Sequence, residues 1–406
     1  MTAANPAPAA RLGSPGEVLL AFARLGIGSF GGPIAHLGYF RAEFVTRRRW
    51  LDEAAYADLV ALCQFLPGPA SSQVGFSLGL IRAGWLGGLA AWTGFTLPSA
   101  AALVLLAYGA AALHGRWAEG VLHGLKLVAV AVVAQAVWGM AHSLCPDRPR
   151  AAIAVLAALL SLLATAAAGQ IAAILLGGIA GLVLCRGAAA PAAAHLPAPV
   201  GRTAGAAALA LFALLLAALP VAHRLVPSQA LALIDAFYRA GALVFGGGHV
   251  VLPLLRAAIV TPGWIGDGAF LAGYGAAQAV PGPLFTIAAY LGTAMRPEPH
   301  GIAGAALALL AIFLPGLLLV TGALPFWAAL RRGRGAQAAM RGVNAAVVGI
   351  LVAALYDPLW TGSVATRGDF ALALLGFVLL AVWRAPPLLV VLLGTIGGAG
   401  LAAIGG

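Results

Sequence analysis

Two Pro-Gly-Pro tripeptides, Pro67-Gly68-Pro69 and Pro281-Gly282-Pro283, are the strongest candidates for chemistry in this 406-residue chain. Proline disfavours helix in the residue before it and glycine allows unusual φ angles, so each tripeptide should break a helix. Because proline suits the first helical position, a new helix should begin directly afterwards. The free N–H groups and the positive dipole end of such a helix can bind an anion. Hydroxyl donors occupy the expected first turns: Ser71, Ser72 and Thr286. A purely structural hairpin is the alternative.

A second kind of helix break is expected at two glycine pairs, Gly31-Gly32 and Gly246-Gly247. Glycine pairs also allow helices to pack closely in membranes, which is the alternative interpretation. His36 and His249 follow these pairs and are candidates for proton coupling. They do not occupy matched positions, however, and a lone histidine in such a segment is more often a satisfied core residue.

Arg24 and Arg239 lie inside apolar segments, shortly before the glycine pairs. Charges inside a membrane are costly and usually functional, and a guanidinium can bind an oxyanion through two hydrogen bonds. We therefore expect both arginines to contact an anion or to supply positive potential, although Arg24 could instead extend to the interface. Gln64 and Gln278 precede the tripeptides and could donate neutral amide hydrogen bonds to the same anion or to a neighbouring helix.

These candidates occur in pairs because the chain contains an internal repeat. Residues 22–32 (FARLGIGSFGG) match residues 237–247 (FYRAGALVFGG) at an offset of 215. The tripeptides match at 214, and Leu97-Pro98 matches Leu314-Pro315 at 217. Offsets that drift by a few residues across loops are expected of an old duplication.

Composition identifies the elements that position these residues. The chain is 62% hydrophobic and 9% charged, with a mean hydropathy of +0.99. Too few charges are present for a water-exposed surface, so much of the surface must face lipid. The net charge of +11 comes from short clusters between apolar segments, which excludes nucleic acid as a partner and is typical of membrane loops. Three widely spaced cysteines predict neither a disulfide framework nor a metal site.

The sequence therefore predicts an all-α polytopic membrane protein with two homologous halves and roughly ten to thirteen membrane segments. Arginine-rich loops lie at different places in the two halves, which favours inverted repeats under the positive-inside rule. No P-loop or catalytic constellation is present, so we expect no enzyme and no cofactor. The predicted organisation is a disordered tail at 1–15, an N-terminal repeat at 16–186, a linker with one extra apolar segment at 187–228, and a C-terminal repeat at 229–404.

The chain resembles the chromate ion transporter family, long two-domain type. The resemblance lies in Phe-Gly-Gly-Pro at 30–33, Gln-Phe-Leu-Pro-Gly-Pro at 64–69, Phe-Gly-Gly-Gly-His at 245–249, Gln-Ala-Val-Pro-Gly-Pro at 278–283 and Phe-Leu-Pro-Gly at 313–316. It implies a multi-pass protein of the bacterial inner membrane that exports chromate using the proton-motive force, with sulfate as the usual competitor. A sulfate or other oxyanion transporter, a non-transporting scaffold and an enzyme are the alternatives, and a homodimer is left open. The two halves differ at Pro33 and Gly248 and at Lys126 and Asn344, so a symmetric site is not assured.

Overall fold

The computed structural model describes residues 13–112, 115–163, 167–186, 196–245, 248–330 and 333–404, and every regular element among them is a helix. The chain is a multi-pass membrane protein, as expected, with five described helices that are long and apolar enough to cross a bilayer. Most of the expected disordered tail and residues 187–195 of the expected linker lie outside the described residues.

The two halves contain corresponding helices in the same order, and α8 separates them. The helices of the second half are divided by more short 3-10 and π segments. The first half consists of α1 (Pro15–Gly28), α2 (Gly32–Phe40), the π-helical η1 (Arg41–Arg47), α3 (Glu53–Phe65), α4 (Ala70–Ala112), α5 (Arg116–Leu144), α6 (Arg148–Leu163) and α7 (Ala167–Leu184). The separating helix is α8 (Arg202–Leu225). The second half consists of α9 (Gln229–Ala242), η2 (Gly248–Val250), α10 (Val251–Leu255), η3 (Arg256–Val260), α11 (Asp267–Ala277), η4 (Leu284–Thr286), α12 (Ile287–Ala294), α13 (Gly301–Ala323), η5 (Leu324–Phe326), α14 (Trp327–Leu330), α15 (Arg334–Ala354), η6 (Leu355–Trp360), α16 (Arg367–Ala381) and α17 (Pro387–Ile404).

The label α4 covers two antiparallel helices that meet at a sharp turn. Ala83 and Gly84 have non-helical dihedrals, and Gly84 has a φ of 64°. The two helices cross so closely that a Cβ on Gly79 would clash with the carbonyl oxygen of Gly87. In the second half, α12 and α13 form the matching hairpin, where a Cβ on Gly292 would clash with the carbonyl oxygen of Gly304.

In the first half, α1 and the segment α2–η1 form a hairpin that returns to the side where it began. Arg48, after η1, pairs with Glu17 in the first turn of α1 at 3.5 Å. Phe22 of α1 stacks on Phe44 of η1, with 4.7 Å between ring centroids. With 14 residues, α1 is about 21 Å long, shorter than the roughly 30 Å of a bilayer core. We call this side, where Glu17 and Arg48 lie, the first face.

A second hairpin of the same kind consists of α3 and the first helix of α4. Asp52 caps α3 near the first face, and its side chain accepts a hydrogen bond from the Ala55 amide at 2.8 Å. After the Pro-Gly-Pro turn the chain returns, and Arg82 pairs with Glu17 at 3.1 Å. Each half therefore inserts two helical hairpins into the molecule, and the tips of these hairpins are the helix breaks predicted from glycine and proline.

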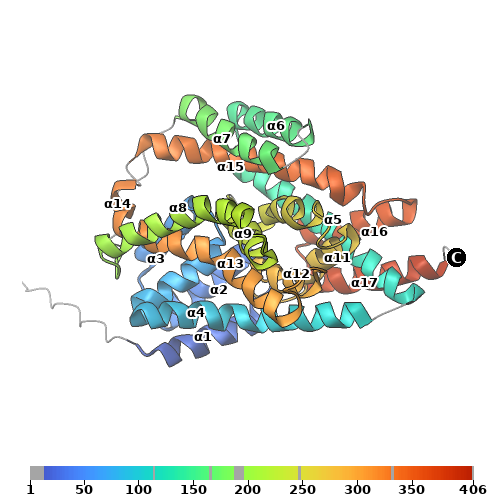
Figure 1. The fold of residues 1–406 in the computed structure, drawn as a ribbon, viewed down its shortest axis with the longest axis horizontal. Helices are drawn as coiled ribbons and strands as arrows, with labels where there is room; N and C mark the ends of the chain where they lie inside the picture. The colour runs from blue at the N-terminus through green and yellow to red at the C-terminus, as the bar shows by residue number, and fades with distance from the viewer. Residues whose placement is uncertain are drawn as a thin grey trace, which may run out of the picture.

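The hairpins of the second half enter from the opposite side. The second helix of α4 leaves the first face at residue 85 and reaches Tyr108 about 35 Å further along. There a Cβ on Gly301, the first residue of α13, would lie 2.8 Å from the Tyr108 hydroxyl oxygen. Figure 1 shows the chain passing along α13 from α12 towards α14, opposite in direction to the second helix of its neighbour α4. The matching helices are therefore antiparallel, and we call the side where Gly301 lies the second face.

The extra helix α8 makes this inversion possible. Near its start, Gly205 lies against Pro325, just after the end of α13 at the first face. Its 24 residues span about 36 Å, enough to carry the chain across to the start of α9. A single additional crossing between two otherwise equivalent halves reverses the orientation of the second half.

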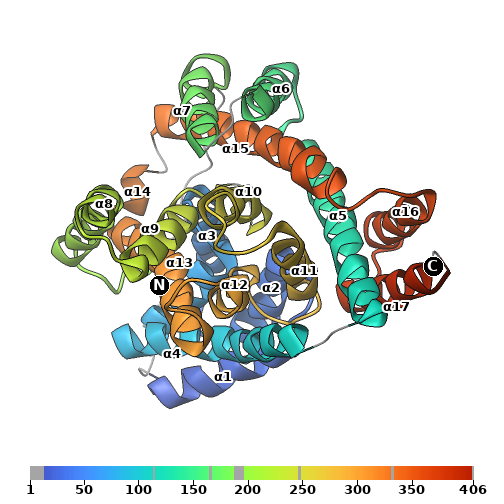
Figure 2. The ribbon, with the colours of Figure 1, turned by 45° about the vertical axis from the view of Figure 1, so that its right-hand side comes forward.

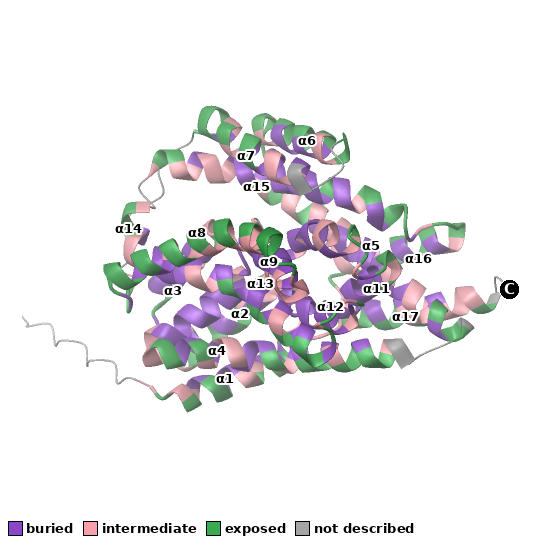
Figure 3. Cartoon of the chain, viewed as in Figure 1, coloured by how far each residue is buried: buried purple, intermediate pink, exposed green. Residues whose placement is uncertain are grey.

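The last two helices of each half pack against the other half. Figure 2 shows α6 and α7 beside α15, and α16 and α17 beside α5. The crossings are close because they occur at glycines: a Cβ on Gly124 would clash with the carbonyl oxygen of Gly394, and one on Gly342 with that of Gly177. Figure 3 shows exposed residues on the outward sides of α6, α7 and α8. Leu156, Leu175 and Leu214 on these helices are exposed large aliphatic residues, as expected of a lipid-facing surface.

Candidate functional site

The hairpin tips of the two halves meet at the centre through a crossed pair of backbone hydrogen bonds. The Gly68 amide donates to the carbonyl oxygen of Val244 at 2.7 Å, and the Gly282 amide donates to that of Ser29 at 3.0 Å. Donors and acceptors are related by the repeat offsets of 214 and 215. Gly68 and Gly282 have φ angles of 117° and 100°, which favour glycine. Each Pro-Gly-Pro turn is therefore hydrogen-bonded to the carbonyl group two residues before the glycine pair of the opposite half.

The Leu-Pro helices complete this centre in the same crossed manner. A Cβ on Gly68 would lie 3.1 Å from the Cα of Gly316, and a Cβ on Gly282 would lie 2.9 Å from the Ser99 hydroxyl oxygen. Gly316 and Ser99 occupy matched positions, at an offset of 217. Because each tip packs against the other half, neither half can form this centre alone.

Gln73 connects the parts of the centre through its side chain, for which the sequence predicts no role. Its side-chain amide donates to the carbonyl oxygens of Pro67 and Gly316, both at 3.0 Å, and the side chain is fully buried. The matched residue is Ile287, so the internal repeat does not mark Gln73. A glutamine in the first turn after a proline break, within an apolar segment, was the available signal.

The hydroxyl residues that follow the tripeptides are buried beside the tips. The Thr286 hydroxyl donates to the Pro283 carbonyl at 2.7 Å, and the Ser71 oxygen lies 3.4 Å from Nδ1 of His36. Nε2 of His36 lies 3.2 Å from the Ser29 carbonyl oxygen, so this histidine connects the two tips of the first half. His249 is placed differently, with Nδ1 2.6 Å from the Tyr274 hydroxyl.

Neither Arg24 nor Arg239 is a buried guanidinium, which differs from the expectation of two charges inside the membrane, and their contact with an anion stays a prediction. Arg24 is exposed on the outer side of α1, because α1 turns Val18, Phe22 and Gly26 inward. Arg239 is partly exposed and donates to the Asp235 carboxylate at 2.7 Å. The periodicity of α1 and the acid one turn before Arg239 account for this difference.

The remaining predicted residues are the two glycine pairs and the two glutamines. Gly31 and Gly32 both adopt positive φ angles at the first break, whereas Gly246 and Gly247 lie outside the described residues. Gln64 is exposed. Gln278 is half-buried, and its amide nitrogen has no hydrogen-bond partner among the described residues.

Comparison with known proteins agrees with this architecture. The profile described as chromate transporter matches residues 16–182 and again residues 231–399. The two matches begin 215 residues apart, which is the offset found within the sequence. The chain belongs to the chromate transporter family. Its resemblance to that family, expected from the tip motifs, is thereby confirmed.

Named members of the chromate transporter family cover most of the chain. The chromate transport protein of Pseudomonas aeruginosa is 29% identical over 343 residues, which are 84% of this chain and 80% of that protein. The probable chromate transport protein of Synechococcus elongatus is also 29% identical, over 82% of each chain. The chromate transport protein of Cupriavidus metallidurans is 26% identical over 84% of this chain and 81% of its own length. No solved structure matches the chain significantly.

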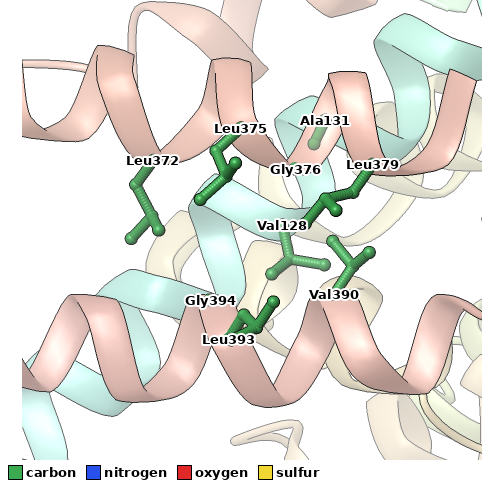
Figure 4. A pocket seen from close by; sticks show the side chains of 9 residues that line it. All are labelled: Val128, Ala131, Leu372, Leu375, Gly376, Leu379, Val390, Leu393 and Gly394. Carbon is green, nitrogen blue, oxygen red and sulfur yellow. The ribbon is translucent and has the colours of Figure 1, made fainter. Parts of the chain in front are cut away.

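One pocket of this family member can be set aside as an anion site. It lies between α5, α16 and α17 and is lined only by aliphatic residues and glycines, among them Val128, Leu375 and Val390 (Figure 4). A dianion would find no hydrogen-bonding side chain there. Within the described ranges, no group of three or more His, Cys, Asp or Glu residues could hold a metal ion. The crossed tips therefore remain the candidate site.

Proposed function

We propose that this chain exports chromate from the cytoplasm by alternating access at the crossed tips. The observation that carries the proposal is the symmetric pair of backbone hydrogen bonds, from the Gly68 amide to the Val244 carbonyl and from the Gly282 amide to the Ser29 carbonyl, in a member of the chromate transporter family. Inverted halves that meet at broken helices near the midplane are a recurring architecture of secondary transporters. Loosening one of the two equivalent contacts while the other holds would open the centre to one face at a time.

The distribution of arginines supports the cytoplasm as the location of the first face. Arg47, Arg48 and Arg49 lie there, as does Arg334 after α13, whereas the matched loop of the first hairpin in the second half contains only Arg256. Under the positive-inside rule the first face is cytoplasmic. In this arrangement four helices in each half and α8 between them cross the bilayer, and the four hairpins re-enter it. The proposed location is the bacterial inner membrane.

The membrane potential favours the proposed direction of transport. Expelling a dianion from a negative cytoplasm is favoured by about 2.3 kcal/mol per charge for each 100 mV. Proton coupling adds to this force if a group at the centre changes its protonation during the cycle, and His36 and His249 remain the candidates. The proposal includes the proton-motive force as the driving force.

Sulfate is the principal alternative substrate, because it is a tetrahedral dianion of similar size and the protein contacts only the oxygens. A non-transporting scaffold or an enzyme would bind an oxyanion without moving it. A homodimer is compatible with the broad lipid-facing surface, but no described contact requires one.

Uptake of radiolabelled chromate into inverted membrane vesicles tests the proposal. We expect uptake above that of vesicles without the protein, inhibition by excess sulfate, and a response to an imposed pH gradient. If uptake does not change with the pH gradient, proton coupling is excluded and facilitated export is the remaining mechanism. Movement of sulfate but not chromate would favour the alternative substrate, and binding without movement would contradict transport.

A further inference from the structure

The two halves of the central site are alike in backbone but unlike in chemistry. At the tips of the first half and on the adjoining helix of α4, polar side chains are concentrated. The matched residues of the second half, at the offsets of the repeat, are apolar or lack a side chain. The pairs are Ser29 and Val244, His36 and Val251, Ser71 and Phe285, Gln73 and Ile287, Thr96 and Phe313, and Ser99 and Gly316. Only Ser72, matched by Thr286, has a hydroxyl counterpart.

His36 joins three segments of the first half, and a turn of the second half adjoins two of them. His36 lies 3.4 Å from the Ser71 oxygen and 3.2 Å from the Ser29 carbonyl oxygen. Its ring packs edge-on against Phe95, which immediately precedes Thr96 on α4. In the opposite half, the Gly282 amide donates to the Ser29 carbonyl oxygen, and the Cα of Gly282 faces the Ser99 hydroxyl.

Three hydroxyl groups in this region are buried without a hydrogen-bond partner. Ser29 Oγ, Ser72 Oγ and Thr96 Oγ1 belong to side chains that are at most 2% exposed. Buried polar groups are normally paired, and leaving a donor unpaired is unfavourable. The Thr286 hydroxyl of the second half, in contrast, is engaged by the Pro283 carbonyl. The unpaired hydroxyl groups at the centre therefore lie in the first half, whereas the unpaired donor just before the Pro-Gly-Pro turn of the second half is the Gln278 amide.

We propose that the oxyanion binds once, off the pseudo-two-fold axis, to three buried hydroxyl groups of the first half, those of Ser29, Ser72 and Thr96, with the Pro281–Pro283 turn adjoining Ser29. We call these three groups the hydroxyl cluster, because Ser29 contacts His36, and Ser72 and Thr96 directly follow Ser71 and Phe95, the other two neighbours of His36. The inference rests on the proposed function and deepens it by naming the groups that recognise the anion. Hydroxyl donors suit the four acceptor oxygens of a tetrahedral oxyanion. No described arginine or lysine donates a hydrogen bond to these three hydroxyl groups. Recognition by neutral donors avoids trapping the dianion against a fixed positive charge, so that it can be released.

Equilibrium binding of radiolabelled chromate to the purified full-length protein tests the cluster. We expect Ser29→Ala, Ser72→Ala and Thr96→Val each to weaken binding about tenfold or more, since each removes a hydrogen bond to a charged ligand. The melting temperature of the unliganded protein should stay equal or rise, because each variant removes an unpaired buried donor. A residue with a purely structural role would instead lower the melting temperature and leave the affinity unchanged. Where an alanine or valine variant does not yield folded protein, cysteine at the same position is the second variant. Its side chain is similar in size to serine and is a weak hydrogen-bond donor.

Ser161→Ala is the matched control, because this hydroxyl donates to the Ala157 carbonyl within its own helix at 2.8 Å. Affinity within twofold of the unaltered protein for all three cluster variants would overturn the hydroxyl cluster while leaving chromate transport intact. If Thr286→Val weakens binding more than the cluster variants do, the anion binds in the second half and the proposal is wrong. An unaltered protein that neither binds nor transports chromate would overturn the proposed function and the cluster together.

Discussion

At the scale of single residues, the repeat is most informative where its two copies differ. Arg24 and Arg239 occupy matched positions, but only Arg239 has an acid one turn before it, since Leu20 matches Asp235. Asp235 is 2% exposed, whereas the Arg239 side chain is 40% exposed. One carboxylate oxygen accepts from the guanidinium, and the other has no described hydrogen-bond partner. The arginine of the second half therefore compensates a buried charge.

Replacing Arg239 with alanine should destabilise the protein, because Asp235 would be left buried and unpaired. The expected loss is roughly 3 kcal/mol, the usual consequence of breaking a buried pair by removing one partner. Adding Asp235→Leu, the residue found at the matched position 20, should restore most of the stability. The melting temperatures of both variants are measured in detergent, with the folded fraction after heating determined by size-exclusion chromatography.

Arg24→Ala serves as the control, because this side chain is exposed on α1. Its melting temperature should match that of the unaltered protein. An Arg239→Ala variant that is equally stable would show that the pair does not support the fold, and would return Arg239 to the list of candidate anion ligands.

At the scale of helices, glycines determine how closely the two halves interlock. The crossings of α5 with α17 and of α15 with α7 use glycines at matched positions, Gly124 and Gly342, which are 218 residues apart. Lipid offers no hydrophobic driving force for helix association, so close backbone approach contributes through packing. Each half thereby holds the last two helices of the other half against its own long helix.

Gly124→Ala and Gly342→Ala should each lower stability by about 1–3 kcal/mol, as expected when a methyl group is forced into a packed interface. The new Cβ would clash with backbone carbonyl oxygens of Gly394 and Gly177, which cannot move independently of their helices. Melting temperatures in detergent compare the two variants.

Gly139→Ala is the control on α5, because a Cβ there meets no atom within 4 Å. It should be neutral, or stabilising by up to about 1 kcal/mol through helix propensity. Equal melting temperatures for all three variants would contradict the packing role of the crossings.

At the scale of the whole molecule, a pair of equivalent ion pairs marks the two faces. Arg41 bonds to Glu53 at 2.6 Å, and Arg256 bonds to Asp267 at 2.9 Å. The arginines are 215 residues apart and the acids 214, so the pairs correspond in the two halves. Each pair ties the first hairpin of its half to the second hairpin at the outer end, opposite the tips. In the inverted arrangement one pair lies at each face.

Single cysteines at positions 53 and 267 should therefore react with a membrane-impermeant maleimide from opposite sides. Both acids are about half exposed, and an exposed ion pair contributes little to stability, so the variants should fold. Cys63, Cys145 and Cys185 are first replaced, because all three are free thiols. Intact cells should label Asp267→Cys, and inverted vesicles should label Glu53→Cys. Labelling of both from one side would contradict the inversion.

The sequence by itself determined the helical class, the duplication, the family and the places where helices break. These features depend on short-range chemistry: proline lacks an amide donor, glycine permits positive φ, and long apolar segments require lipid or a protein core. Pro67-Gly68-Pro69 was recognisable for this reason, and so was its partner at 281–283.

Only the tertiary structure decided which groups meet at those breaks. Nothing near Gly68 in the chain specifies that its amide bonds to Val244, and Gln73 contacts Gly316 at a separation of 243 residues. The outward direction of Arg24 depends on which side of α1 packs against α4, and the exchange of terminal helices depends on both halves being present. Such contacts depend on how whole helices pack against one another. Local backbone chemistry determines where the chain turns, whereas the neighbouring helices determine which groups the turn contacts.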